Sequence, residues 1–437
     1  MNRYVIVGSG VTGTSAAAVL RASDRTAEIT LVSDDPHGYY SRPGLAYYLT
    51  GEIPEKQLYI YNDLKWRELN IHFVKQRVTR LRPDAHQLQL HPLGVLSYDR
   101  LLLATGSTSL SLKVPGADLQ GVVKLDDFED ALRLRKLARR IKTAVVVGGG
   151  IVAMEMIEGL VSQGVKVQYL LRGERYWPAV LDEAESRLVE QRLSEEGVQF
   201  HYRTEVAEIY GSGGKVTGVK TTGGEVLKCG MVAVGIGVQA RIELAQTAGL
   251  KTERGILTNE YLQTTDPDVF AAGDVAQFLD PLTGRSTIDN LWNPGREQGE
   301  AAGRNMAGQM EVYHKPVIVN IARLAGLLTT IIGAVGGGKD DELISVERGS
   351  SENWQALPGS IAMESGSEVN HMRLMVGERT LQGAVLIGDQ SVSFPLQELI
   401  LAQVDITPIR AHLIQPTASL GQEIMEYWTK WRQHAAQ

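Results

Sequence analysis

The sequence predicts an α/β protein with two separate β-α-β units and an α+β region at its C-terminal end. Three observations lead to this class: short β-branched strands that end in glycine loops, small-residue helices directly after those loops, and a change of pattern past about residue 312. Short apolar strands that alternate with helices are typical of parallel sheets, whose strands are buried on both faces.

The two β-α-β units have the same order of elements. The first is predicted to have a strand at 3–7 (RYVIV), a helix at 11–22 and a strand at 28–32 (EITLV). The second is predicted to have a strand at 143–147 (TAVVV), a helix at 151–162 and a strand at 165–171. Such units place two parallel strands side by side and join them with a helix.

The C-terminal region has a different pattern, with strands within 371–388 followed by helices at 395–403 and 420–434. The longest nearly uncharged stretch, 324–338, is shorter than the ~20 apolar residues of a membrane helix, so we expect buried strand there. No secretory signal is visible before the first strand. We therefore expect a cytoplasmic protein with no membrane span.

Composition and charge exclude several classes of function. The 437 residues include 44 Lys and Arg against 51 Asp and Glu, a net charge of −7, so nucleic-acid binding is not expected. The single cysteine, Cys229, cannot form an internal disulfide, a CxxC pair or a cysteine-ligated iron–sulfur cluster, and we expect an inert buried thiol. The nine histidines are scattered without an HExxH motif, so no metal site is predicted.

The first glycine loop, GSGVTG, has the spacing of a dinucleotide-binding loop. Gly8 permits the tight turn, Gly10 lets a pyrophosphate approach the backbone, and Gly13 lets helix and strand pack closely. The free amides at the helix N-terminus then face the phosphates. Asp34 follows the next strand where a carboxylate would bind ribose hydroxyls, and Asp35 is an adjacent rival.

The second glycine loop, GGGIVA, occupies the same place in the second unit. Gly148 and Gly150 repeat the glycine positions, and Ala153 still allows close packing. Where an acid would select NADH, the sequence has Arg172, followed by Arg175. Since arginine can pair with a 2′-phosphate, NADPH is favoured over NADH. The alternative is that Arg172 is a solvated charge and both nucleotides bind.

Two Rossmann-like dinucleotide-binding domains in one chain imply two dinucleotides, and a flavin with a nicotinamide is the natural pair for hydride transfer. Four motifs resemble the FAD-dependent pyridine nucleotide oxidoreductases with two such domains: GSGVTG (8–13), YDRLLLATGS (98–107), VVVGGGIVAME (145–155) and DVFAAGD (268–274). Within that family the chain is most similar to rubredoxin reductases, oxygenase-type ferredoxin reductases and the reductase part of the nitrite reductase large subunit.

The resemblance implies domain limits and site residues. The expected domains are an FAD-binding domain (1–112 and 243–312), an NAD(P)-binding domain (113–242) and a C-terminal cap or interface domain (313–437). The positions that match FAD-binding motifs are Gly8, Gly10, Gly13, Asp34, Arg42, Pro43, Val78, Thr105, Gly106, Asp274, Glu297 and Gln298. Those that match the nicotinamide nucleotide's pyrophosphate loop are Gly148, Gly150 and Ala153.

Two further positions take their meaning from the resemblance. Glu155 matches the family's helix glutamate near the nicotinamide, although an ordinary surface acid is the alternative. Glu297 and Gln298 are expected to open a helix whose N-terminus points toward the flavin pyrimidine, where its dipole suits an electron-rich flavin.

The chain departs from its relatives at the predicted reaction centre. Members with redox cysteines have one where this chain has Pro43, so a cysteine mechanism is not expected. Oxygenase-type ferredoxin reductases have a lysine near flavin N5 where this chain has Tyr47. Its hydroxyl could donate a hydrogen bond there, or the ring could simply pack.

The implied activity is hydride transfer from NAD(P)H to FAD and release of electrons to an external acceptor. A ferredoxin- or rubredoxin-type carrier is the leading acceptor, and the basic run 133–142 (RLRKLARRIK) could steer an acidic carrier, although a solvated helix is the simpler interpretation. Alternatives are an NAD(P)H oxidase, a quinone or small-acceptor reductase, and a non-catalytic or regulatory FAD-containing subunit of a larger redox complex. A homodimer also stays open.

Overall fold

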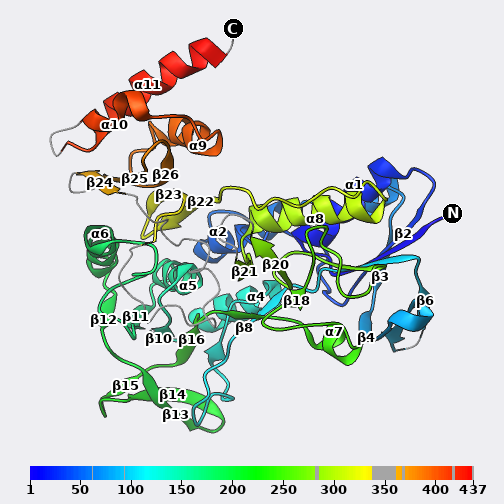
Figure 1. The fold of residues 1–437 in the computed structure, drawn as a ribbon. Helices are drawn as coiled ribbons and strands as arrows, with labels where there is room; N and C mark the ends of the chain where they lie inside the picture. Colours follow the sequence, from blue (N-terminus) through cyan, green and yellow to red (C-terminus); the bar gives the residue numbers. More distant parts are fainter. Residues whose placement is uncertain are drawn as a thin grey trace.

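Three five-stranded sheets organise the protein (Figure 1). The computed structural model describes residues 1–61, 63–92, 94–280, 285–336, 361–366, 370–415 and 419–435. The first and second sheets are parallel and the third is antiparallel. This confirms the predicted fold class, whereas the limits of the three domains stay a prediction.

The first sheet has the strand order β19-β7-β1-β2-β3. Its strands are β1 (Arg3–Val7), β2 (Glu28–Ser33), β3 (His72–Lys75), β7 (Arg100–Leu103) and β19 (Val269–Ala271). Helices α1 (Val11–Ser23) and α8 (Trp292–Met306) lie side by side on it (Figure 1). They approach closely because α8 has glycine at the contact: a Cβ atom at Gly299 would lie 2.2 Å from the carbonyl oxygen of Thr12.

The second sheet has the order β12-β11-β10-β16-β9. Its strands are β9 (Val122–Val123), β10 (Thr143–Val147), β11 (Lys166–Leu170), β12 (Gln199–His201) and β16 (Met231–Val234). Its helices are α4 (Phe128–Ala138), α5 (Ile151–Val161) and α6 (Glu183–Glu195). An antiparallel layer of β13 (Val206–Ser212), β14 (Lys215–Thr221) and β15 (Val226–Lys228) shares a hydrophobic core with β10 and β16.

Cys229 belongs to that core. It directly follows β15 and is 6% exposed. Burial raises the pKa of its thiol to about 11, so the thiolate is scarce at neutral pH. The predicted burial of this thiol is confirmed, and its lack of reactivity stays a prediction.

The third sheet has the order β22-β23-β26-β25-β24. Its strands are β22 (Val319–Leu324), β23 (Leu327–Gly333), β24 (Ile361–Gly366), β25 (His371–Val376) and β26 (Leu381–Ile387). Helices α9 (Ser393–Leu401), α10 (Thr407–Leu413) and α11 (Leu420–Ala435) complete this region, and their buried side chains share one hydrophobic core with the sheet. The predicted buried strand within 324–338 is confirmed at β23, while residues 337 and 338 lie outside the described residues.

Smaller elements connect and extend these sheets. They are α2 (Gly44–Thr50), α3 (Asp63–Glu68), α7 (Glu243–Thr247), β4 (Arg77–Arg82), β5 (Gln87–His91), β6 (Val95–Ser97), β8 (Ser107–Ser109), β17 (Val238–Ala240), β18 (Ile256–Leu257), β20 (Ala276–Asp280), β21 (Arg285–Thr287) and the 3-10 turns Glu55–Gln57 and Pro83–Ala85. The chain leaves the first sheet through β8 and returns through β17, and these two strands pair antiparallel.

The predicted elements match the structure closely at the two β-α-β units. β1 and β10 have the predicted bounds, and the helices that follow them end within one residue of the prediction. Around 371–388 the structure has two strands, because Gly377 begins a tight turn whose amide bonds the carbonyl oxygen of Thr380. Helix α10 was not predicted.

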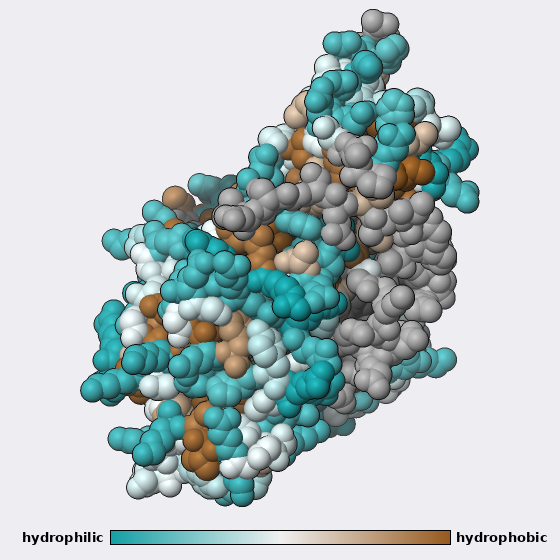
Figure 2. Space-filling view, turned by 90° about the vertical axis from the view of Figure 1, so that its left-hand side faces the viewer, coloured by the Kyte–Doolittle hydropathy of each residue, from teal (hydrophilic) through white to brown (hydrophobic). Residues whose placement is uncertain are grey.

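The surface of the described residues is mixed. On the face shown in Figure 2, hydrophilic residues surround several separate hydrophobic patches. None of the described helices is long and apolar enough to cross a membrane.

A buried ion pair joins the C-terminal sheet to α6. The Arg373 guanidinium of β25 donates to both carboxylate oxygens of Glu185 at 3.0 Å and to the carbonyl oxygens of Val180 and Val335 at 2.7 Å. Arg373 is 3% exposed and Glu185 is fully buried. Burial alone would raise the pKa of Glu185, but the hydrogen bond from His371 and the Arg373 charge outweigh it, so the pKa lies below its usual value.

The same cluster contains potential metal ligands. Donor atoms of Asp182, Glu185 and His371 lie within 4.8 Å of one another. Arg373, however, already binds Glu185 and lies 3.3 Å from the Asp182 carboxylate. Since a cation already occupies the space between the acids, we assign this cluster to packing between the two regions.

Replacing Arg373 with methionine is expected to lower the free energy of unfolding by about 3–5 kcal/mol, because the Glu185 charge would stay buried without its partner. Urea unfolding followed by tryptophan fluorescence measures the loss. Arg379→Met is the matched control, because its ion pair with Asp405 is exposed to solvent and such pairs contribute little to stability. Equal losses in the two variants would contradict the prediction.

Candidate functional site

The first glycine loop forms an open cradle at the end of β1. Gly8 has φ +116°, and a Cβ atom there would lie 2.1 Å from the carbonyl oxygen of Ala104. A Cβ at Gly13 would lie 2.0 Å from the carbonyl oxygen of Gly8, whereas none would meet an atom within 4 Å at Gly10. The outer glycines are therefore required by the backbone itself, and the middle one leaves space at the N-terminus of α1, where a phosphate could approach.

The second loop repeats this geometry at the end of β10. Gly148 has φ +136°, and a Cβ there would lie 2.0 Å from the carbonyl oxygen of Gly235. Gly150 is open in the same sense as Gly10. Ala153 is fully buried against Gly235, whose own Cβ would lie 2.9 Å from the Ala153 amide nitrogen. Both loops fit a dinucleotide pyrophosphate by the same test.

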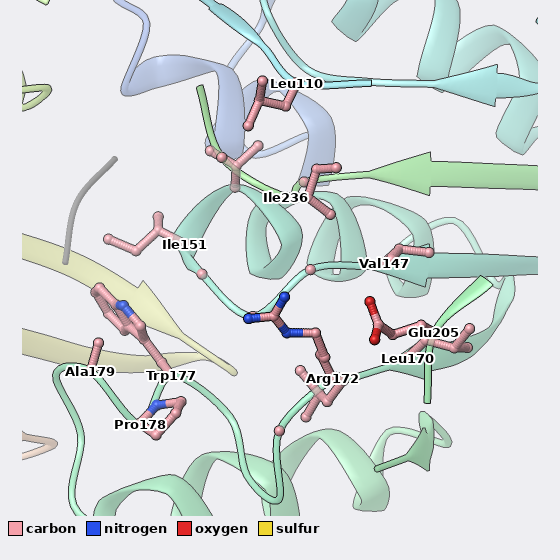
Figure 3. A pocket seen from close by; sticks show the side chains of 18 of the residues that line it. Leu110, Val147, Ile151, Leu170, Arg172, Trp177, Pro178, Ala179, Glu205 and Ile236 are labelled. Atoms are coloured by element: carbon pink, nitrogen blue, oxygen red, sulfur yellow. The ribbon is translucent and has the colours of Figure 1, made fainter. Parts of the chain in front are cut away.

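A cavity of about 1400 Å³ opens from the second loop (Figure 3). Arg172 and Arg175 line it together with Trp177 and Tyr202. In Figure 3 the Arg172 side chain extends into the middle of the cavity, toward the glycine loop. The nearby acids Glu174 and Glu183 pair with Arg203 and Arg187, and no ion pair of Arg172 is found within the described ranges.

The two rival aspartates after β2 have different surroundings. Asp34 is exposed, with a carboxylate oxygen 3.9 Å from Nε of Arg77. Asp35 is half-buried and accepts a hydrogen bond from the His37 amide at 2.8 Å, and burial raises its pKa. Asp34 is thus the freer acceptor. Val78 lies half-buried in β4, next to Arg77.

Asp274 lies just beyond the end of β19, beside the start of the crossover strand β8. It accepts a hydrogen bond from Ser107 Oγ at 2.6 Å, and burial raises its pKa despite that bond and the nearby Arg42 charge. Thr105 donates to the carbonyl oxygen of Arg241 at 3.0 Å. Gly106 has φ +69° and accepts from the Arg241 amide at 2.9 Å. Pro43, beside Arg42, is the N-cap residue of α2.

The expectation that Glu297 and Gln298 open a helix is wrong. Helix α8 begins five residues earlier at Trp292, because Pro294 is tolerated in a first turn, where its missing N–H is not needed. Gln298 is fully buried and accepts from the Gly273 amide at 2.8 Å. Its Nε2 atom has no hydrogen-bond partner within the described chain. This orphaned donor suits a ligand with an acceptor atom.

Glu155 is not an ordinary surface acid. Burial, and then the charge of Glu158, raise the pKa of Glu155 to about 8. The helix that bears it, α5, packs against α2, where Gly159 leaves room for Leu49. Tyr47 lies on α2 with its ring under the Arg323 guanidinium, 5.3 Å from its centroid, so its predicted hydrogen bond to a flavin stays a prediction.

The basic segment 133–142 divides into two parts. Leu134 is buried and faces the core, as the simpler interpretation expects. Arg135 lies over the Tyr48 ring at 4.3 Å and is withdrawn from the surface. The five remaining cations are exposed: Arg133, Lys136, Arg139, Arg140 and Lys142.

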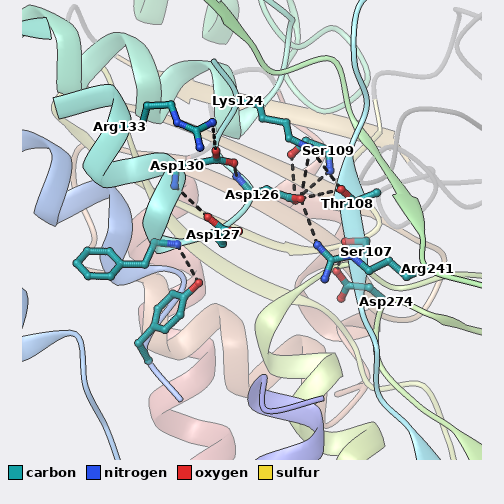
Figure 4. A network of polar contacts seen from close by, with 12 residues as sticks. Ser107, Thr108, Ser109, Lys124, Asp126, Asp127, Asp130, Arg133, Arg241 and Asp274 are labelled. Carbon is teal, nitrogen blue, oxygen red and sulfur yellow. Dashed lines mark hydrogen bonds and ion pairs between the residues drawn. The ribbon is translucent and has the colours of Figure 1, made fainter. Parts of the chain in front are cut away.

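The sequence patterns did not reveal the residue that joins the two crossover strands. Asp126 accepts hydrogen bonds from Thr108 Oγ1 at 2.7 Å, the Ser109 amide at 2.9 Å and Arg241 at 3.2 Å (Figure 4). Thr108 and Ser109 belong to β8, and Arg241 follows β17. No local spacing relates Asp126 to Arg241, which lies 115 residues away.

The chain matches a family model and several known proteins. The model of the pyridine nucleotide-disulphide oxidoreductases matches residues 2–299. The assimilatory nitrate reductase electron transfer subunit of Bacillus subtilis (strain 168) is 27% identical over 95% of this chain and 51% of its own length. The rhodocoxin reductase of Rhodococcus erythropolis is 32% identical over 66% of this chain and 67% of its own.

A solved structure covers nearly the whole chain. The covalent complex of putidaredoxin reductase with putidaredoxin matches with a TM-score of 0.84 and 25% identity, over 98% of this chain and 99% of the other. The chain spans about half the length of the first curated relatives that it matches.

The open middle glycine can be tested directly. Gly10→Ala is expected to leave the stability of the cofactor-free protein unchanged, since nothing lies within 4 Å of the new Cβ, yet to weaken FAD binding about tenfold or more by crowding the pyrophosphate. Flavin titration by fluorescence measures the affinity. Gly13→Ala is the comparison variant, because its clash with Gly8 should destabilise the fold itself. Unchanged FAD affinity in Gly10→Ala would contradict the prediction.

Proposed function

The chain belongs to the pyridine nucleotide-disulphide oxidoreductase family, and from this premise we propose that it is an FAD-dependent NAD(P)H oxidoreductase that passes electrons to an external acceptor. The observation that supports this most is the pair of glycine cradles, each open at its middle position. The family binds FAD and NAD(P)H, and FAD supplies the hydride-accepting and electron-releasing chemistry when bound. Cys229, buried in a hydrophobic core, takes no part.

FAD is assigned to the first loop and its surroundings, within residues 1–112 and 243–312. Gly10 would admit the pyrophosphate, and the exposed Asp34 would accept from the adenosine ribose. Asp274 would accept from the ribityl chain, and the free Nε2 donor of Gln298 would meet a flavin or ribityl oxygen. The Arg42 cation, whose charge opposes the burial-driven rise in the pKa of Asp274, would balance negative charge on the cofactor.

The nicotinamide nucleotide is assigned to the cavity at the second loop, within residues 113–242. Gly150 would admit its pyrophosphate. Arg172 extends into the cavity, where Glu174 and Glu183 already have cationic partners. Glu205 lies beside Arg172 in Figure 3, but no ion pair between them is found within the described ranges. A guanidinium without an ion-pair partner suits a 2′-phosphate better than a ribose hydroxyl. NADPH is therefore the preferred reductant.

A small redox protein is the proposed acceptor, in a ferredoxin- or rubredoxin-type role. Rhodocoxin reductase and putidaredoxin reductase are named for such partners. The five exposed cations of segment 133–142 would attract an acidic carrier. The nitrate reductase relative makes a separate oxidoreductase subunit the second candidate.

Anaerobic stopped-flow absorbance tests this function. The FAD-loaded protein is mixed with NADPH or NADH, and the loss of oxidised flavin absorbance is followed. Fast bleaching with a nucleotide, followed by reoxidation on addition of an acidic carrier, is the expected result. Negligible bleaching with both nucleotides would overturn the proposed function.

Arg172→Ala is expected to raise the dissociation constant for NADPH about 10- to 100-fold, since a hydrogen bond to a charged group contributes about 1.5–3 kcal/mol. The dissociation constant for NADH should change little, because NADH has no 2′-phosphate. Arg203→Ala is the matched control, because its exposed guanidinium pairs with Glu174. Equal losses of affinity for NADPH and NADH would show that Arg172 does not bind the 2′-phosphate.

Glu155 predicts a pH dependence of nucleotide binding. Its pKa of about 8 means that it is neutral at pH 7 and ionised at pH 9. Ionisation should strengthen binding of NADP⁺, whose nicotinamide is cationic, by about tenfold or less, as opposite charges in a partly buried site attract. Calorimetry at several pH values measures this, with NADPH, whose nicotinamide ring is uncharged, as the control. A pH profile that survives in Glu155→Gln would contradict the assignment.

A further inference from the structure

Arg323 in the C-terminal sheet contacts elements of both other regions. Its Nη1 and Nη2 atoms donate to the two carboxylate oxygens of Glu52 at 2.8 and 2.6 Å. Its Nε atom lies 3.9 Å from Glu158, and its guanidinium covers the Tyr47 ring. This one side chain of β22 thus contacts α2 at Tyr47, Glu52 just after α2, and α5 at Glu158.

A second contact from the same hairpin holds α5. The amide of Gly326, in the turn between β22 and β23, donates to the Glu158 carboxylate at 3.0 Å. Glu158 is 8% exposed, and burial raises its pKa while the Gly326 amide and the Arg323 charge oppose that rise. The hairpin therefore contacts α5 through the carboxylate that lies one turn beyond Glu155.

The direct contact between α2 and α5 is tight but apolar. A Cβ atom at Gly159 would lie 2.8 Å from Cβ of Leu49, so the helices touch at this point. Apolar packing of this kind limits the separation of the two helices, but because it is non-directional it restricts sliding and rotation less than directional bonds do. The forked bonds from Arg323 to Glu52 are directional, because a guanidinium binds a carboxylate in a fixed plane.

Stability alone does not account for this arrangement. Arg323 is 24% exposed and Glu52 is 44% exposed, and ion pairs so close to solvent contribute little to folding. Arg323 does, however, connect the helix that bears Tyr47, through Glu52, with the helix that bears Glu155, through Glu158. These are the two residues assigned to the flavin side and the nicotinamide side of the reaction centre.

We propose that Arg323 is a positioning residue that holds α2 against α5 and so sets the spacing between the flavin and nicotinamide halves of the reaction centre. The proposal rests on the proposed function. It makes the C-terminal domain a working part of hydride transfer, since misplacing reactants by about 1 Å can cost 100-fold in rate.

Three variants test the contact from both sides. Arg323→Gln removes the positive charge and the forked donor, Arg323→Lys keeps the charge but loses the fork, and Glu52→Gln removes the negative charge and one of the two acceptor oxygens. Arg432→Gln is the matched control, because Arg432 also pairs with a carboxylate, Glu398 at 3.0 Å, and lies over aromatic rings within the C-terminal domain. Two readouts are used: flavin reduction at saturating nucleotide, and hydrogen exchange of the amides at 44–52.

The expected results separate positioning from folding. Arg323→Gln and Glu52→Gln should each slow flavin reduction about tenfold or more, with nucleotide dissociation constants unchanged, and the double variant should be no slower than either. Hydrogen exchange at 44–52 should quicken in both. The rate of flavin reduction in Arg323→Lys should lie between the rates of these variants and that of wild type, and the rate in Arg432→Gln should equal that of wild type.

Several outcomes would overturn the proposal. These are wild-type reduction in Arg323→Gln, rate losses that parallel loss of bound FAD, and additive losses in the double variant. If Arg323→Gln does not fold, Glu52→Gln decides alone. If wild type is not reduced by either nucleotide, the proposed function fails, and unchanged exchange at 44–52 in Glu52→Gln would then reject the contact independently.

Discussion

The geometry of the whole protein depends on how Asp126 joins the two crossover strands. The chain passes from the first sheet to the second through β8 and returns through β17. Asp126 accepts from β8 and from Arg241 beyond β17, so both crossings are tied to the segment that leads into α4.

Asp126 can hold these strands together because the negative charge of its carboxylate is compensated by its neighbours. Burial would raise the pKa of Asp126, but the Thr108 hydrogen bond and the charges of Lys124 and Arg241 outweigh it and hold the pKa below its usual value. The carboxylate is therefore ionised at neutral pH and accepts hydrogen bonds from several donors. Because Arg241 also contacts Thr105 and Gly106, these contacts extend to the predicted FAD site.

The C-terminal sheet is joined to the rest by two arginines of different character. Arg373 is buried and multiply bonded to α6, so its contact is a matter of stability. Arg323 is partly exposed, and its contacts reach the two helices nearest the predicted reaction centre. The difference in burial explains why we assign packing to one and positioning to the other.

The two β-α-β units, their glycine loops and Arg172 could be predicted from local sequence patterns. Gly8 and Gly148 are required by their positive φ angles, and Gly13 by its contact with the Gly8 carbonyl oxygen five residues before it. Such local needs leave a fixed spacing in the sequence. Arg172 was found for the same reason, since it follows a strand of known type.

The rest depends on contacts between distant residues. Asp126 meets Arg241 across 115 positions, and Arg323 meets Glu52 across 271. The raised pKa of Glu155 and the orphaned amide of Gln298 likewise follow from burial and packing. A side chain's partners and burial are set when separate elements pack together, so no periodicity or motif along the chain records them.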